Sequence, residues 1–213
     1  MTTTSPDLLA NCLTVASDAA LAAGAILRDE FHRPEGPRGG SGHAPADDEA
    51  EAVIRARLTG FTPDWGFLGE ETGRHALRAD RPYWLVDPND GTSAYLKGYR
   101  GSAVSIALIE HGVPVLGVVY APTAPDDGGD LFTWAKGHPL RRNAIEVTRA
   151  ALPTALAHDV VVLLNHDHAR EPFASAAYVA PARHRSVPSI AYRLALVAAG
   201  EADATVSTGG PTT

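Results

Sequence analysis

The amino-acid sequence predicts a mixed α/β fold. Two stretches near the N-terminus carry apolar residues at helical spacing, and several short apolar runs bounded by turn residues follow them. A further strand-like run and a further helical stretch lie near the C-terminal end. Helices and strands that share one chain bury their apolar faces against one another, so we expect helices packed on a sheet.

The first predicted helix covers residues 6–31. Pro6 and Asp7 are typical of a first helical turn. The apolar residues that recur at helical spacing after them are Leu8, Leu9, Cys12, Val15, Ala19, Ala22, Ala23 and Ile26. A loop rich in Gly and Pro follows over residues 34–45, and a second helix is predicted over about residues 47–59.

The strands are predicted from apolar runs that end in turn residues. A short strand lies near residues 66–68, and a buried strand ends at Val86. Residues 102–110 and 113–120 form a pair joined by a short turn, which is typical of a hairpin. Further strands are expected at 131–135, 145–147 and 160–164, with a helix over about 190–199.

Composition limits the function classes. The chain has 213 residues and a formal net charge of −7, which disfavours nonspecific nucleic-acid binding because phosphate backbones attract basic surfaces. Its single cysteine, Cys12, excludes an intramolecular disulfide and suits a reducing compartment. No run approaches the roughly 20 apolar residues that span a bilayer. We therefore expect a cytoplasmic protein without a nucleic-acid or membrane partner.

The segment from Asp87 to Thr92, Asp-Pro-Asn-Asp-Gly-Thr, is the most informative one. Asp87 and Asp90 in a tight turn can point at one spot, with the carbonyl of Asn89 between them. Such oxygen ligands suit a hard cation such as Mg²⁺. Gly91 allows close approach to the backbone, and Thr92 can cap a short helix whose first N–H groups would bind phosphate. The same residues also make a favourable plain turn, so the segment alone leaves both interpretations open.

Other segments support the cation interpretation. A Gly-Glu-Glu motif at residues 69–71 ends an apolar run upstream of Asp87, and an acidic helix start contains Asp47. Together with the strand pair at 104–108 and 117–122 and the Ala-Gly-Glu-Ala-Asp-Ala stretch at 199–204, these motifs resemble the inositol monophosphatase family. Its members are Mg²⁺-dependent, lithium-sensitive sugar and nucleotide phosphatases. The resemblance implies a layered αβαβα sandwich of the sugar-phosphatase type, and commonly a homodimer.

The resemblance also implies a metal site. Glu70, Asp87 and Asp90 match the metal-binding carboxylates of the family, and the carbonyl of Asn89 matches its backbone ligand. Two cations at such a site let one activate water while the other stabilises the leaving oxygen. Asn89 stands where the family usually has Ile or Leu, but its backbone carbonyl can still bind a cation.

Catalytic and substrate-binding roles follow from the same resemblance. Asp47 and Thr92 match a pair that orients or deprotonates the attacking water, and Glu70 is the competing candidate for that task. Gly91 and Thr92 would offer backbone N–H groups to the substrate phosphate, beside Asp90. Glu51 and Glu71 either hold the metal ligands in place or lie on a solvated face, and Asp48 and Glu49 are expected to be plain surface carboxylates.

The sequence departs from the family near its C-terminal end. In the family a Trp-Asp pair, whose Asp binds metal, follows the Ala-Gly-x-Ala-Asp-Ala stretch, whereas this sequence stops at Thr213. We therefore expect an α+β lobe with the metal site over residues 1–150, and the start of an incomplete C-terminal α/β lobe over 151–213. Ser207 stands about where inositol-cleaving members carry a Glu, which weakens the case for inositol phosphate.

Two functions remain open at this point. The first is a Mg²⁺-dependent phosphomonoesterase that hydrolyses a small sugar, inositol or nucleotide phosphate with metal-activated water. Its partner would be a small phosphorylated metabolite. The second is a catalytically impaired phosphatase-like module that binds cations, phosphorylated ligands or a partner protein. Retention of Glu70, Asp87, Asp90 and Thr92 favours the first function, and absence of the Trp-Asp pair favours the second.

Overall fold

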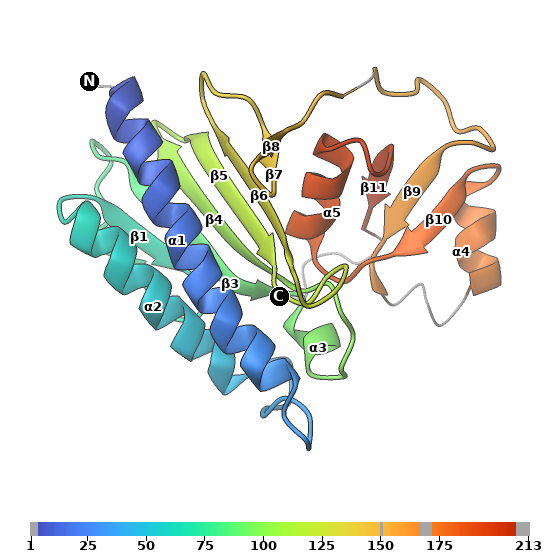
Figure 1. Ribbon diagram of the computed structural model, residues 1–213, viewed down its shortest axis with the longest axis horizontal. Coiled ribbons are helices and arrows are strands. Elements are labelled where there is room, and N and C mark those ends of the chain that lie inside the picture. Colours follow the sequence, from blue (N-terminus) through green and yellow to red (C-terminus); the bar gives the residue numbers. More distant parts are fainter. Residues whose placement is uncertain (1–3, 150, 167–171, 208–213) are drawn as a thin grey trace.

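The computed structural model describes residues 4–149, 151–166 and 172–207. Its elements stack in five layers (Figure 1). A pair of helices, α1 (Pro6–Phe31) and α2 (Pro45–Phe61), covers one face of a large sheet. Helix α5 (Ile190–Ala198) lies between this sheet and a small one, and α4 (Pro172–Val179) packs on the far side of the small sheet. The predicted αβαβα sandwich is confirmed.

The large sheet has eight strands in the order β2-β1-β3-β4-β5-β6-β7-β8. They are β1 (Gly66–Gly69), β2 (Gly73–His75), β3 (Tyr83–Asp90), β4 (Ala103–Glu110), β5 (Val113–Ala121), β6 (Asp130–Ala135), β7 (Arg141–Arg142) and β8 (Ile145–Glu146). Strands β1 and β3 pair in parallel, and the other neighbouring pairs are antiparallel. The predicted hairpin is the pair β4 and β5, in which Ile106 lies opposite Val118.

The small sheet is entirely parallel among the described residues. Strand β9 (Val161–Leu164) lies between β10 (Arg183–Ser186) and β11 (Ala204–Val206). Residues of β9 are buried on both sides, as expected for a parallel strand covered by helices. The two sheets fall on either side of residue 150, but the predicted division into two lobes stays a prediction.

Helix α1 follows its predicted bounds and buries one face against α2 and the sheet. Ser5 caps its start, with the Ser5 Oγ atom accepting from the Leu8 N–H at 3.3 Å. Gly24 allows the helix to approach β5, because a Cβ atom there would overlap the ring of Tyr120. By length and composition α1 is also apolar enough to cross a membrane, whereas we expected no such stretch from the sequence. Its buried residues, among them Cys12 and Leu27, pack as those of a core helix do.

Strand β3 corrects the prediction of a tight turn from Asp87 to Thr92. The strand continues to Asp90, and its pairing with β4 shifts register between Asp87 and Asp90, as at a β-bulge. The chain turns only at Gly91, whose φ of +103° is favourable for glycine alone. The bulge changes the direction of the acidic side chains while the backbone still pairs.

Several short elements had no counterpart in the sequence analysis. They are β2, β7, β10, β11 and α4. Strands of two to four residues are too short for an alternating pattern to appear. The second helix was predicted over residues 47–59, and it extends two residues further at each end because Pro45 suits a first helical turn.

A buried ion pair joins the large sheet to α5. The Asp130 carboxylate is fully buried and accepts from Arg142 Nε at 2.8 Å and Arg142 Nη2 at 2.9 Å. It also accepts from Asn143 Nδ2 at 3.1 Å and from the Tyr192 hydroxyl at 2.9 Å. Tyr192 belongs to α5, so this carboxylate connects strands β6 and β7 to the helix between the sheets.

We expect Asp130→Asn to destabilise the protein by about 2–3 kcal/mol, because it leaves the largely buried Arg142 guanidinium without its main counter-charge. Tyr192→Phe removes a single hydrogen bond and should cost about 1 kcal/mol. Urea unfolding of both variants measures the difference. If both variants lose the same free energy of unfolding, the charge of Asp130 contributes nothing beyond its hydrogen bonds.

Candidate functional site

The candidate site lies where β1 and β3 end side by side. These strands are parallel, and Gly69 of β1 pairs with Val86 of β3. The next residues, Glu70 and Asp87, therefore leave the two strands as neighbours. The Glu70 N–H donates to the carbonyl of Val86 at 3.0 Å and extends this pairing. The parallel register brings the two acidic motifs of the sequence together.

Asp87 is the most perturbed carboxyl of this group. Burial raises its pKa strongly, the charges of Glu70 and Asp90 raise it further, and a hydrogen bond shared with Glu70 acts in the same direction. The N–H of Asn89 donates to Asp87 Oδ1 at 3.0 Å and opposes this shift. None of Glu70, Asp87 and Asp90 forms an ion pair with Lys or Arg within the described residues. Negative charge is thus concentrated, and the nearest opposing charge is a longer-range interaction of Asp90 with the buried Arg193.

Asp90 is tied to the start of α5. Its Oδ2 atom accepts from the Ser189 hydroxyl and from the Ala191 N–H, both at 2.7 Å. Ser189 is also the N-cap of α5, where its Oγ atom accepts from the Tyr192 N–H at 2.9 Å. These bonds fix the orientation of Asp90 through one carboxylate oxygen. By resemblance to the family, Pro188-Ser189 stands where a Gly-Ser pair near the substrate pocket is usual, but the bond of Ser189 to Asp90 was not predicted.

Asp47 lies in a polar cluster with Asn89 and Thr92. The Asp47 side chain is fully buried, and its Oδ1 atom accepts from Asn89 Nδ2 at 2.9 Å. Its Oδ2 atom lies 3.0 Å from the Thr92 hydroxyl, which is also 2.9 Å from the carbonyl of Asn89. Burial raises the pKa of Asp47, and the two side-chain hydrogen bonds partly offset the rise. The predicted pairing of Asp47 with Thr92 is therefore present, and the amide of Asn89 is a third member.

The structure corrects the predicted cap at Thr92. Helix α3 (Thr92–Tyr95) begins after Gly91, which takes the N-cap position without a side-chain hydrogen bond. The Thr92 hydroxyl points instead to Asp47 and Asn89. Because α3 has four residues, it contributes little macrodipole, and binding of phosphate at Gly91 would depend on individual N–H groups.

Glu51 holds the turn that carries Glu70. Its fully buried carboxylate accepts from the N–H groups of Glu71 and Thr72, each at 2.9 Å, and from the Thr72 hydroxyl. A Cβ atom on Gly69 would overlap this carboxylate, so glycine is required at that position. Of the two interpretations of Glu51, the structure supports the positioning role and excludes the solvated face.

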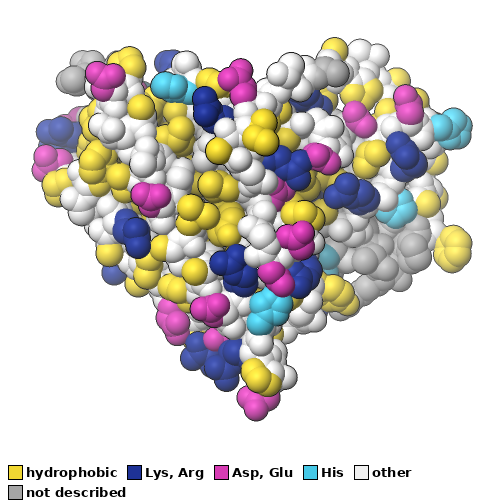
Figure 2. Space-filling view, viewed as in Figure 1, with side chains coloured by type: hydrophobic (Ala, Val, Ile, Leu, Met, Phe, Trp, Pro, Cys, Tyr) yellow, Lys and Arg dark blue, Asp and Glu magenta, His cyan; other side chains and the backbone are white. Residues whose placement is uncertain are grey.

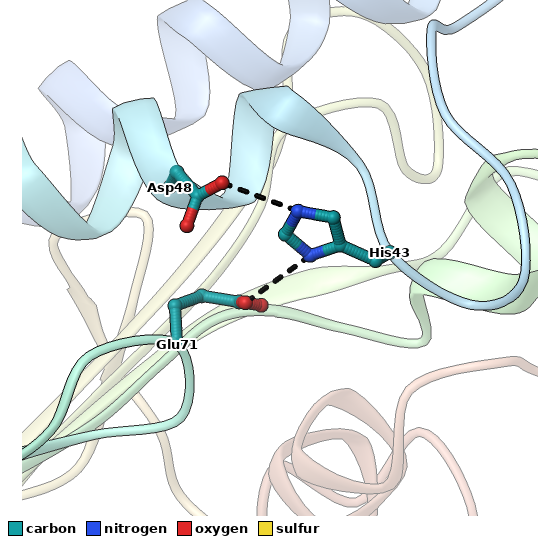
Figure 3. Close-up of side chains that lie close together, drawn as sticks. All are labelled: His43, Asp48 and Glu71. Carbon is teal, nitrogen blue, oxygen red and sulfur yellow. Dashed lines mark ion pairs between the residues drawn. The ribbon is translucent and has the colours of Figure 1, made fainter.

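Glu71 forms an ion pair with a histidine. It is not one of the carboxylates that match metal ligands of the family. Figure 3 shows His43 between Asp48 and Glu71. The His43 Nε2 atom lies 3.2 Å from Asp48 Oδ2, and His43 Nδ1 lies 3.2 Å from Glu71 Oε2. Asp48 was expected to be a plain surface carboxylate, and its sequence context gave no sign of this contact. Glu49, the other such carboxylate, is exposed and pairs with Arg38 at 3.3 Å.

The arrangement suits a hard divalent cation. Glu70, Asp87 and Asp90 supply carboxylate oxygens, and the raised pKa of Asp87 reflects charge that a cation would neutralise. A cavity of about 390 Å³ opens beside Glu70 and Asp87, and its other lining residues are Leu68, Gly69, Leu85, Val86, Ser105 and Ala107. This volume is within the range of small-molecule sites.

We expect Asp87→Asn to stabilise the cation-free protein at neutral pH. The pKa of Asp87 is higher in the folded than in the unfolded chain, so its contribution to stability is present at low pH and is lost as the pH rises from about 4. Asparagine removes this loss, and Tm should rise by roughly 2–4 °C for each kcal/mol of repulsion relieved. Thermal unfolding with a chelator, at pH 4 and pH 7.5, measures the effect. A variant less stable than the native chain at both pH values would contradict it.

We expect the Asn89→Leu variant to fold, but to lose the hydrogen bond from Asn89 that orients Asp47. Removing the Nδ2 donor leaves a buried carboxylate oxygen without its partner, at a cost of about 1–3 kcal/mol. Chemical unfolding measures the loss of unfolding free energy in Asn89→Leu, in Thr92→Val and in the double variant. The loss in the double variant should differ from the sum of the two single losses, because both side chains bond one carboxylate. Strictly additive costs would contradict a shared role.

The sequence of this chain is similar to those of one known protein family and of several of its members. A model of the inositol monophosphatase family matches residues 8–213. An inositol-1-monophosphatase from Synechocystis sp. is 34% identical over 177 residues, which are 77% of this chain and 60% of that protein. The 3′(2′),5′-bisphosphate nucleotidase CysQ of Escherichia coli is 48% identical over 79 residues, 36% of this chain and 32% of that protein. The chain thus spans less than two thirds of these relatives.

Solved structures show the same architecture. The inositol monophosphatase from Anabaena (Nostoc) sp. PCC 7120 superposes with a TM-score of 0.75 at 29% identity, covering 95% of this chain and 76% of that one. The extragenic suppressor protein suhB from Bartonella henselae gives a TM-score of 0.75 at 28% identity, covering 92% and 78%. The family model spans nearly the whole sequence, and its fold is the layered sandwich described above. The chain belongs to the inositol monophosphatase family.

Proposed function

We propose that this chain is a Mg²⁺-dependent phosphomonoesterase for a small sugar, inositol or nucleotide phosphate. The observation that carries the proposal is the meeting of Glu70, Asp87 and Asp90 without a cationic partner, beside the bonded pair of Asp47 and Thr92. Family membership supports it, since relatives are named as an inositol-1-monophosphatase and a bisphosphate nucleotidase.

In this proposal the residues of the site have separate roles. Glu70, Asp87, Asp90 and the carbonyl of Asn89 would hold the cations. When bound, Mg²⁺ neutralises charge on the phosphate and makes water a better nucleophile. Glu51 keeps the Glu70 turn rigid, and Ser189 and the N-terminus of α5 fix Asp90, so that these carboxylates need no reorganisation.

Proton transfer would involve Asp47 and Thr92. A hydroxyl has one hydrogen, and when Thr92 donates it to Asp47 the Thr92 oxygen can accept a hydrogen bond from the attacking water. Burial raises the pKa of Asp47 and so makes the carboxylate a stronger base. Glu70 is the competing base, and it is exposed and hydrogen-bonded to Asp87.

The substrate is proposed to be a sugar or nucleotide phosphate ahead of inositol phosphate. Ser207, at the position where inositol-cleaving members carry Glu, is shorter, and its Oγ atom is bonded to Arg193 Nη2 at 2.9 Å. The cavity beside Glu70 and Asp87 is lined mainly by apolar side chains on one side, such as Leu68, Leu85 and Ala107. Such a wall suits the less polar face of a nucleoside or sugar.

We also propose a cytoplasmic homodimer. Cys12 is a buried free thiol, which suits a reducing compartment. On the face drawn in Figure 2, acidic and basic side chains are interspersed with apolar ones, and the net charge is −7. These features favour a small phosphorylated metabolite over nucleic acid or a membrane as partner, and the dimer rests on the family resemblance.

Phosphate release from a panel of phosphomonoesters tests the function. The native chain should release phosphate only with Mg²⁺, and Thr92→Val should lower kcat by roughly 10²–10⁴-fold, the usual range for a lost proton-transfer group. Glu146→Gln, which changes an exposed carboxylate on β8, is the matched control and should not alter the rate. Binding of Mg²⁺ without phosphate release from any ester would refute the esterase proposal and favour the impaired, cation-binding module.

A further inference from the structure

A second group of possible metal ligands shares no residue with the carboxylates assigned to Mg²⁺. It consists of His43, Asp48 and Glu71, and Figure 3 shows the His43 ring between the two carboxylates, with one ring nitrogen directed to each. Each residue offers one ligand atom, and these three atoms lie within 4.8 Å of one another. Ligands that share one ion at about 2.0–2.2 Å lie about 3–4 Å apart, so one ring nitrogen and both carboxylates could bind one ion after rotation of these side chains.

The backbone holds the three residues in place. His43 closes a tight hairpin with Gly40, in which each residue donates its N–H to the carbonyl of the other, at 3.0 and 3.2 Å. Asp48 lies in the first turn of α2, which begins two residues after His43. The N–H of Glu71 is bound by the buried carboxylate of Glu51. The hairpin before α2, the first turn of α2 and the turn after β1 are thus each hydrogen-bonded where they carry these side chains.

The charges of the group are not balanced by the protein. Asp48 and Glu71 each form an ion pair with His43 and with no Lys or Arg among the described residues. One imidazole carries at most one positive charge, whereas the two carboxylates carry two negative ones. Glu71 is only 16% exposed, and the nearby charges of Asp47, Glu70 and Asp48 add to the negative potential around it. A divalent cation bound by a neutral imidazole and two carboxylates would make the group neutral.

We propose that His43, Asp48 and Glu71 bind one divalent transition-metal ion, such as Zn²⁺ or Mn²⁺, with ligands other than those assigned to Mg²⁺. The imidazole sets the selectivity, because His is a common ligand of Zn²⁺ and other transition metals, whereas Mg²⁺ prefers an all-oxygen shell. The site would connect the loop before α2 to the turn that carries Glu70. The proposal does not depend on phosphatase activity, since it concerns metal binding by the folded chain.

Calorimetric titration with Zn²⁺ in excess Mg²⁺ tests the site. The native chain should bind one equivalent of Zn²⁺ that Mg²⁺ does not displace, and His43→Ala and Asp48→Asn should each lose it. His138→Ala removes an exposed imidazole from outside the group and should retain the site. Asp87→Asn should also retain it while losing Mg²⁺ affinity, which separates this proposal from the proposed function.

Three results would overturn the proposal. One is Zn²⁺ binding that Mg²⁺ displaces, because the ion would then occupy the carboxylates assigned to Mg²⁺. Another is an equal loss of Zn²⁺ in His43→Ala and His138→Ala, which indicates weak binding to surface histidines in general. The third is the absence of any Zn²⁺ equivalent in the native chain. His43 and Asp48 are exposed, so their variants should fold, and circular dichroism checks this.

Discussion

Repulsion among carboxylates at the ends of β1 and β3 is the constraint on which the site depends. The parallel register forces Glu70 beside Asp87, and the bulge in β3 adds Asp90. Burial raises the pKa of Asp87, and this cost persists in the absence of a cation because no Lys or Arg pairs with the three residues in the described part of the chain. Such a locally unfavourable charge arrangement is typical of functional sites, and it is the basis of the proposed cation site.

The surrounding structure keeps these carboxylates from moving apart. Glu51 binds the backbone after Glu70, and the start of α5 binds one oxygen of Asp90. Rotation of the Asp90 side chain would therefore break its two bonds to the start of α5. This rigidity also explains the requirement for glycine at position 69, where the Glu51 carboxylate occupies the space of a side chain.

The long helices and strands and the acidic motifs could be predicted from the sequence. Contacts between segments that are distant in the sequence could not. The helix over Pro6–Phe31 and the hairpin of β4 and β5 have clear periodicity, so their existence followed from the pattern alone. The turn expected at Asp87 is a bulged strand, because local turn propensity was overridden by pairing with β4. The contact of His43 with Glu71 depends on how the loop before α2 packs, and no local pattern encodes it.

Asp90 connects the chemistry of the site to the packing of the two sheets. It extends from β3 of the large sheet, and the partners of its Oδ2 atom are the first residues of α5, the helix that lies between the sheets. Asp130 of the large sheet bonds the same helix through Tyr192. Two carboxylates of the large sheet thus bond the first residues of α5. The orientation of Asp90, one of the proposed cation ligands, therefore depends on the docking of α5, and not on the acidic motifs alone.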